Sequence, residues 1–282
     1  RRQRQMCIRD SMRIARFSYN EVPQYAFVQK DETDGKDYLV ALEGHPLSPQ
    51  GVKPTGKRYA LDADGVRLLV PVIPSKVYGL AKNYDTRSDD ERATSSAASS
   101  HTAADMVIFT KPSTSVIGPD DPIVIPACSN DMNFEPEVAV VMGKIAKNVT
   151  ADTAMNYVFG FTCVNDVTLR DCAGSDPMWT RAKGFDTSCP LGPWITTELN
   201  WRDAHISFTL NGENVPEADG TTARLIHSIP EQIAAISSFS TLLPGDVILT
   251  GTPYPAGTLR AGDEAIVHVD GIGSLRNVIV HA

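Results

Sequence analysis

Asn133-Phe-Glu-Pro-Glu-Val-Ala-Val-Val-Met142 joins two acids to a Val-rich run that is typical of a buried β-strand. Side chains alternate along a strand with period two, so Glu135 and Glu137 point to the same face. Carboxylates held this close repel each other and are costly to desolvate. A cation between the two acids would relieve that repulsion. The alternative interpretation is that both acids are solvated charges at the edge of a strand.

Around this stretch, apolar runs separated by turn residues predict a chain in which strands outnumber helices. The runs cover residues 14–17, 25–28, 38–42, 66–72, 76–84, 106–112, 123–126, 157–164, 206–211, 247–250, 265–269 and 275–280. One clear helix is predicted over 230–239, because Pro230 suits a first helical turn and Ile233 and Ile236 lie near one face. A short helix is predicted over 151–154. These elements indicate an α+β fold with mixed or mainly antiparallel sheets.

Three segments are predicted along the chain. Residues 1–11 are basic within an acidic chain and contain no apolar segment of a secretory signal. We expect them to be a non-native leader before a natural start at Met12, the alternative being a real basic tail. Residues 12–73 predict a small β-rich N-terminal domain, and 74–282 predict a larger domain that contains the acidic strand. Within the larger domain, the polar stretch 85–104 indicates a mobile loop or a loosely packed lid helix.

Charge and composition exclude several classes of partner. The 282 residues carry a formal net charge of −8, which argues against nucleic acid or an anionic membrane surface as a partner. No apolar run approaches the roughly 20 residues that a membrane helix needs. The five cysteines are scattered without a CxxC pair, as expected of reduced thiols in a cytoplasmic protein.

A third acid, Asp166, follows a second apolar strand and is the best candidate to join Glu135 and Glu137. Three carboxylates without a nearby His or Cys select a hard cation such as Mg²⁺, Mn²⁺ or Ca²⁺ over zinc. An octahedral ion with three protein ligands keeps open positions. The carboxylate and keto oxygens of a 2-oxo acid can fill two of them, and the ion would then stabilise the developing enolate.

Three further residues are candidates for binding an anionic substrate. Lys183 can balance the charge of the acids and bind an oxyanion, and the alternative is a solvated surface lysine. Arg170 lies four residues after Asp166, the separation of one helical turn. It can hold a substrate carboxylate through two hydrogen bonds, or form a structural salt bridge with Asp166 or Asp171. Thr252 follows a strand in a Gly-containing loop whose N–H and hydroxyl groups can meet an anion, unless that loop is an ordinary turn.

Several blocks, in the same order and spacing over about residues 76–280, resemble the fumarylacetoacetate hydrolase family. The blocks are Gly79-Leu-Ala-Lys-Asn-Tyr84, Phe109-Thr-Lys-Pro-Ser-Thr-Ser-Val-Ile-Gly118, Phe134-Glu-Pro-Glu-Val-Ala-Val-Val-Met-Gly143, Asn165-Asp-Val-Thr-Leu-Arg-Asp171, Arg181-Ala-Lys-Gly-Phe-Asp-Thr187, Cys189-Pro-Leu-Gly-Pro193, Leu243-Pro-Gly-Asp246, Thr250-Gly-Thr-Pro253 and Gly271-Ile-Gly-Ser-Leu-Arg-Asn277. The resemblance implies a large mixed β-roll with a small N-terminal domain in front, usually in a homodimer. It also implies Mg²⁺ or Mn²⁺ and a small 2-oxo acid substrate.

The resemblance assigns roles residue by residue. The metal ligands fall on Glu135, Glu137 and Asp166, and the family's lysine falls on Lys183. Thr187 falls near the metal ligands, while the threonine and the arginine that meet the substrate fall on Thr252 and Arg170.

Two features depart from the family pattern, the lid pair and one substrate-binding position. Many members carry Asn-Tyr-x-x-His-x-x-Glu, whose His–Glu pair activates a water or moves a proton. Here Arg87 stands at the His position, and it cannot act as a base at neutral pH. Asp90 stands at the Glu position as the remaining lid acid, and His101 in the longer lid can fold back to replace the missing base. Ala173 stands where some relatives place a substrate-binding Gln.

Three hypotheses for function remain open from the sequence. The leading one is a hydrolase that cleaves a C–C bond of a small 2-oxo or 2,4-dioxo acid through an enolate, with Lys183 and Asp90 as catalytic residues. The second is an oxaloacetate-type decarboxylase or a 2-hydroxy-dienedioate isomerase, for which the lid pair is dispensable. The third is a weakened metal-dependent binding protein that has lost the lid histidine.

Overall fold

Most strands of the chain join one large, mainly antiparallel sheet. The computed structural model describes residues 12–87, 102–253 and 257–282. In pairing order the sheet contains β4 (Lys53–Ala60), β3 (Asp37–Glu43), β2 (Val22–Lys30), β1 (Arg13–Tyr19), β14 (Cys189–Thr196), β12 (Val158–Asn165), β11 (Pro136–Met142), β18 (Val247–Leu249), β6 (Val77–Ala81) and β7 (Val107–Lys111). At its margins β5 (Val66–Leu69) pairs with β1, and β8 (Val116–Ile117) pairs with β14 in parallel.

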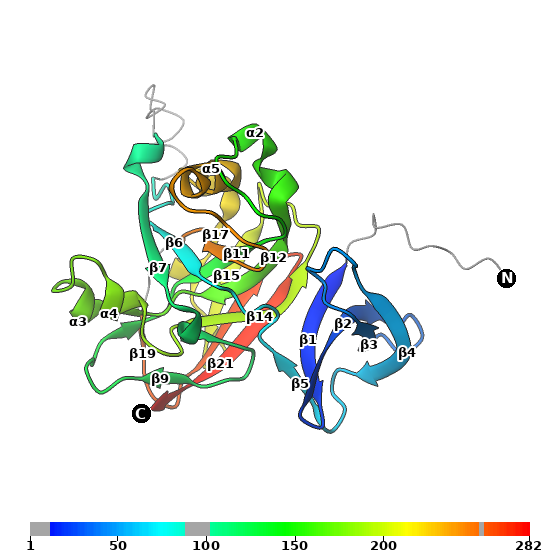
Figure 1. Ribbon diagram of the computed structural model, residues 1–282. Coiled ribbons are helices and arrows are strands. Elements are labelled where there is room, and N and C mark those ends of the chain that lie inside the picture. The colour runs from blue at the N-terminus through cyan, green and yellow to red at the C-terminus, as the bar shows by residue number, and fades with distance from the viewer. Residues whose placement is uncertain (1–11, 88–101, 254–256) are drawn as a thin grey trace.

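The N-terminal strands connect to the rest of the molecule through a short pairing. Arg13 and Ile14 of β1 lie opposite Thr196 and Ile195 of β14. Figure 1 shows β1–β5 to one side of the larger body, which contains the remaining strands and the helices. The division of the chain between residues 73 and 74 stays a prediction.

Two smaller sheets pack against the large one. The first contains β16 (Glu213–Asn214), β15 (His205–Leu210), β20 (Glu264–Val269), β21 (Gly273–His281) and β9 (Ile123–Ile125), with β17 (Gly220–Thr221) paired to β15. The second contains β13 (Thr168–Leu169), β10 (Met132–Asn133) and β19 (Thr258–Leu259). Their apolar side chains form a common core with β11 and β12, in which the rings of Phe134 and Phe208 stack with centroids 3.8 Å apart. The prediction of an α+β fold with mixed sheets is confirmed.

The helices of the described residues are short, apart from α5 (Ile229–Phe239). The others are α2 (Ala151–Ala154), α3 (Arg170–Ala173), α4 (Thr180–Lys183) and the 3₁₀ turns η1 (Ala103–Asp105), η2 (Ser113–Ser115), η3 (Met155–Tyr157), η4 (Pro216–Ala218) and η5 (Thr222–Arg224). Helix α5 begins one residue before the predicted start at Pro230, and it buries Ile229, Ile233 and Ile236. Within the described residues, none of these helices has the length and apolar character to cross a membrane.

Strands β4 and β14 were not anticipated from the sequence, for opposite reasons. Strand β4 is mostly exposed, so it lacks the apolar run that marks a strand, and its pairing with β3 holds it. Strand β14 is buried along its whole length but contains Pro190, Gly192 and Pro193, which argue against a strand. Its neighbours β12 and β1 on the two sides and β8 at one end determine its conformation. Tertiary pairing therefore overrides local preference in both strands.

Candidate metal centre

Strand pairing between β11 and β12 brings the three candidate acids together. Pro136 lies opposite Asn165 in the antiparallel register, so Glu135 and Asp166 both come just beyond the paired segment. The amide of Asp166 donates to the carbonyl oxygen of Glu135 at 2.9 Å, and the Asn165 side chain accepts from the amide of Glu135 at 2.9 Å. These bonds fix two residues that are far apart in sequence at one corner of the sheet.

The carboxylates of Glu135, Glu137 and Asp166 form one cluster. One oxygen atom from each lies within 4.8 Å of the others. Glu137 and Asp166 are each 1% exposed, and the side chain of Glu135 is 15% exposed. The interpretation of Glu135 and Glu137 as solvated edge charges is therefore wrong, because neither side chain is free in solvent.

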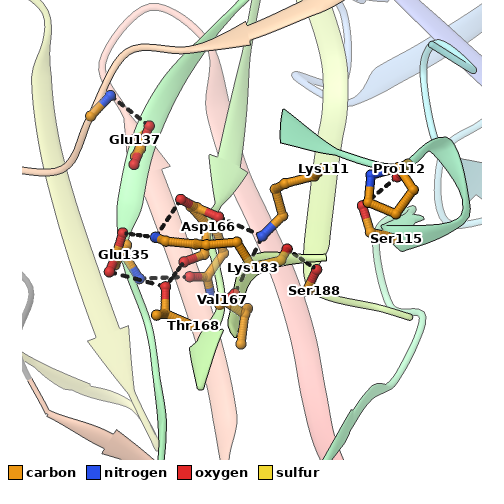
Figure 2. Close-up of polar contacts among 12 residues, drawn as sticks. Lys111, Pro112, Ser115, Glu135, Glu137, Asp166, Val167, Thr168, Lys183 and Ser188 are labelled. Carbon is orange, nitrogen blue, oxygen red and sulfur yellow. Dashed lines mark hydrogen bonds and ion pairs between the residues drawn. The ribbon is translucent and has the colours of Figure 1, made fainter. Parts of the chain in front are cut away.

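Two buried lysines contact this cluster from opposite sides (Figure 2). Lys183 on α4 donates from Nζ to Glu135 Oε2 and to Asp166 Oδ2, both at 2.7 Å. Lys111 on β7 donates to the other oxygen of Asp166 at 2.5 Å and to the carbonyl of Val167 at 3.3 Å. Lys183 is 5% exposed and is not the surface lysine of the alternative interpretation.

Sequence reasoning missed Lys111, although it lies inside a quoted block. In β7 the buried positions are Phe109 and Lys111, which alternate with exposed ones. A lysine on the inward side of an apolar strand needs a buried partner. That pattern is the signal from which its role was predictable.

The charges of the cluster do not balance within the protein. Three carboxylates face two lysine ammonium groups, which leaves one negative charge. Burial and the carboxylates of Asp166 and Glu135 raise the pKa of Glu137 well above its ordinary value. Burial alone would raise the pKa of Asp166, but Lys111 and Lys183 lower it. The cluster is thus short of positive charge on the side of Glu137.

A divalent cation fits this donor set. The three acids offer only oxygen atoms, which Mg²⁺ and Mn²⁺ accept, and a cation would stabilise the charged form of Glu137. Glu137 accepts one protein hydrogen bond in the described residues, from the amide of Gly251 at 2.7 Å. Gly251 has φ +101°, a conformation that favours glycine and aims this amide at the carboxylate. Glu135, Glu137 and Asp166 are the residues that would hold the ion.

A cavity of about 630 Å³ opens beside the cluster. Its wall includes Leu80, Ala81, Lys82, Tyr84, Thr86, Glu135, Thr168, Ala173, Gly174, Trp179, Ala182, Lys183, Thr252 and Pro253. In the described part of the chain, the buried hydroxyl groups of Thr252 and Tyr84 have no hydrogen-bond partner. Buried polar groups without partners are uncommon and costly, so a ligand in this cavity has two hydroxyl groups to engage. A role of Thr252 in binding an anion stays a prediction.

Arg170 and Thr187 lie outside the wall of this cavity. Arg170 begins α3 and is exposed, and no salt bridge to Asp166 or Asp171 occurs among the described residues. The helical spacing to Asp166 does not apply, because Thr168–Leu169 forms a strand. The hydroxyl of Thr187 accepts from the amide of Val124 at 2.9 Å. A role in substrate binding stays a prediction for both residues.

The lid is only partly described. Asp90 and His101 lie outside the described residues, so their proposed roles stay predictions. Arg87, at the family's histidine position, pairs with Asp85 at 2.7 Å. Ala173, at the family's glutamine position, does line the cavity.

Comparison with known proteins places this site in a family. A model of the fumarylacetoacetate (FAA) hydrolase C-terminal domain matches residues 76–280. The chain belongs to the fumarylacetoacetate hydrolase family. A second model, of the Rv2993c-like N-terminal domain, matches residues 12–71.

Relatives within the fumarylacetoacetate hydrolase family cover most of the chain. Protein Rv2993c of Mycobacterium tuberculosis is 42% identical over 229 residues, which cover 80% of this chain and 82% of that protein. The mitochondrial oxaloacetate tautomerase of Rattus norvegicus is 36% identical over 227 residues, covering 76% of this chain and 70% of that protein.

Solved structures of the fumarylacetoacetate hydrolase type superpose on the chain. The 2-hydroxyhepta-2,4-diene-1,7-dioate isomerase of Mycobacterium marinum has a TM-score of 0.83 and 36% identity, covering 96% of this chain and 98% of that one. The maleylpyruvate hydrolase of Sphingobium sp. SYK-6, solved with manganese(II) and pyruvate, has a TM-score of 0.75 and 25% identity, covering 96% and 100%. The β-roll architecture implied by the sequence is confirmed.

Proposed function

We propose that this member of the fumarylacetoacetate hydrolase family is an Mg²⁺- or Mn²⁺-dependent isomerase that interconverts the keto and enol forms of a small 2-oxo acid. The observation that carries the proposal is the Lys183 ammonium group, held between two of three clustered carboxylates at the wall of a cavity. A divalent cation in the cluster would supply Lewis-acid stabilisation of charge on the keto oxygen.

Lys183 can act as a hydrogen-bond donor to the same developing oxyanion. Burial alone would lower the pKa of Lys183, but Asp166 and Glu135 raise it above its ordinary value. The ammonium group therefore keeps its proton at neutral pH and does not act as a base. Lys111 holds Asp166 from the other side, and this contact positions the carboxylate that orients Lys183.

Thr252 is suited to bind an oxygen atom of a substrate in the cavity. Its hydroxyl is buried and without a partner in the described residues, and it lies in the same wall as Glu135 and Lys183. A substrate carboxylate or keto oxygen would satisfy it. Because an unsatisfied hydroxyl is costly, this contact favours an oxygen-rich ligand over an apolar one.

The altered lid favours isomerisation over hydrolysis. Hydrolysis of a C–C bond needs a base that activates water, and Arg87 holds a proton at neutral pH and pairs with Asp85. Keto–enol interconversion adds no water across a C–C bond; it moves one proton from the carbon beside the keto group to the enolate oxygen, and solvent water can carry that proton where Lys183 and a bound cation would stabilise the enolate. A protein named for oxaloacetate tautomerisation and a structure named for dienedioate isomerisation are among the similar proteins, in support of this choice. Hydrolysis is the second candidate, because a maleylpyruvate hydrolase also superposes.

A substrate panel tests the proposal. Purified protein with Mg²⁺ would receive oxaloacetate, an acylpyruvate and a hydroxymuconate-type dienoate, with enol absorbance and product release followed separately. We expect faster interconversion of enol and keto forms without C–C cleavage, and a loss of about 100-fold or more in Lys183→Met. Cleavage of the acylpyruvate would show a hydrolase instead. No turnover with retained ligand binding would show a binding protein.

A further inference from the structure

We propose that Lys82 forms a second anion site in the cavity, which binds the distal carboxylate of a dicarboxylate substrate. This proposal rests on the proposed function, since it concerns a ligand of the same cavity. It narrows the substrate class from 2-oxo acids in general to 2-oxo or 2-hydroxy-enoic diacids.

Lys82 is a positively charged residue of the cavity wall whose ammonium group is available to bind a ligand. Among the described residues that line the cavity, the cations are Lys82 and Lys183, and Lys183 is engaged by Glu135 and Asp166. Lys82 is exposed, and its ammonium group makes no salt bridge or side-chain hydrogen bond within residues 12–87, 102–253 and 257–282. A ligand can therefore take this ammonium group without displacing a protein partner.

The backbone presents Lys82 at the cavity in a fixed and unfavourable conformation. Its φ is +56°, in the left-handed region that residues other than Gly, Asn and Asp seldom adopt. On one side lies β6, and on the other the buried Asn83 side chain donates to the carbonyl oxygen of Thr250 at 2.8 Å and accepts from the amide of His227 at 2.9 Å. Strained residues held by surrounding structure are concentrated at ligand sites, and here the strain lies at the cavity wall.

The charges favour a ligand with two negative groups. With all three acids ionised, as they would be around a bound divalent cation, the acids, the two lysines and the cation together would carry one positive charge. That charge matches the first carboxylate of a 2-oxo acid. Lys82, a residue of the same cavity wall, carries a further positive charge, which a second carboxylate would neutralise.

The test compares two ligands that differ at the distal carboxylate, which is charged in one and esterified in the other. Oxaloacetate has a free carboxylate at the end distant from its keto group, and its 4-ethyl ester does not. We would measure Kd by calorimetry with Mg²⁺ and kcat/KM for keto–enol interconversion, in wild type and Lys82→Met. Methionine keeps the length of the side chain and the same backbone penalty. We expect Lys82→Met to weaken oxaloacetate binding and kcat/KM by about tenfold or more, and to leave both values for the ester unchanged.

Two further variants separate a specific contact from bulk charge. Lys144 is exposed and outside the cavity wall, so Lys144→Met removes the same net charge and should change neither ligand. Lys82→Arg keeps the positive charge and should retain most of the preference for oxaloacetate. An equal effect of Lys82→Met on both ligands, or no effect on either, would overturn the proposal.

Failure of the proposed isomerase activity gives a different pattern. If wild type interconverts neither compound but binds oxaloacetate more tightly than the ester, and Lys82→Met removes this difference, the distal carboxylate site stands and the isomerase does not. If wild type turns over both compounds with equal kcat/KM and binds them equally, the activity stands and the distal site does not.

Discussion

Buried carboxylates occur at both ends of the β11–β18 strand pair, and their surroundings differ. At one end, Asp246 is fully buried and accepts from Ser75 Oγ at 2.5 Å, from the amide of Leu243 at 2.7 Å and from the ammonium group of Lys76. At the other end, Glu137 accepts from the amide of Gly251 and lies beside two more acids. The same two strands therefore hold Asp246, which has several hydrogen-bond donors and a cation, and Glu137, which has one hydrogen-bond donor among the described residues.

The difference shows that burial alone does not mark a functional acid. Asp246 has a cation and several donors, so its charge stabilises the turn between residues 243 and 246 and the start of β18. The pKa of Glu137 is raised by burial and by neighbouring carboxylates, so its charged form is unfavourable until a cation arrives. A shortage of hydrogen-bond donors and cations around a buried carboxylate, rather than its burial, identifies the site that needs a ligand.

The largest expected effect is on activity in Glu137→Gln. This substitution replaces a charged carboxylate ligand with a neutral amide of nearly the same volume. We expect a loss of activity of more than about 100-fold. Without metal the variant should be no less stable than wild type, because the charged Glu137 is unfavourable there. Activity assays and thermal unfolding in EDTA would measure the two effects. Activity within a few-fold of wild type would contradict the metal-site assignment.

Asp246→Asn should show the opposite pattern. We expect it to lower the free energy of unfolding by about 2–3 kcal/mol, because hydrogen bonds to a buried charge are lost and Lys76 loses its partner. Metal-dependent activity per folded molecule should be retained. Chemical denaturation measures the loss, and unchanged stability would show that the donors around Asp246 contribute little.

Metal binding should stabilise the folded protein through Glu137 and not through Asp246. At a metal concentration of 100 times Kd, we expect about 2.7 kcal/mol of stabilisation in wild type, a rise in Tm of about 5 °C for a chain of this size. The shift should disappear in EDTA and in Glu137→Gln, and it should persist in Asp246→Asn relative to that variant's own baseline. Equal shifts in wild type and Glu137→Gln would place the metal elsewhere.

The smallest effect concerns an exposed carboxylate that has its donors. The amide and hydroxyl of Ser228 both donate to Glu231 Oε2 at 2.7 Å at the start of α5. The hydrogen bond from the Ser228 side chain, and after it the one from the Ser228 amide, lower the pKa of Glu231 against the opposing effect of burial. Ser228→Ala should cost about 1 kcal/mol or less at neutral pH. Because the pKa of Glu231 is lower in the folded state, its charged form stabilises the fold at pH values above the unfolded pKa. This contribution is lost as the pH falls through the folded pKa, so the stability difference between wild type and Ser228→Ala should shrink on acidification. A difference that grows on acidification would contradict this.

Much of the site was predictable because it follows from short-range rules. Period two along a strand predicted that Glu135 and Glu137 would share a face, and the order of sequence blocks predicted the family and the β-roll. Helix α5 was predictable from its proline and its apolar face. The strand β14 was not, since its prolines favour other structures and only its neighbours hold it extended.

The sequence by itself determined which acids and lysines were present, their spacing on each strand and the family to which the chain belongs. The tertiary structure decided that Lys111 meets Asp166, that Arg170 lies outside the cavity wall although Ala173 of the same helix lines it, and that Asp246 has donors which Glu137 lacks. The reason is physical: these relations depend on pairing between strands distant in sequence, and the burial and charge of a side chain follow from its neighbours in space.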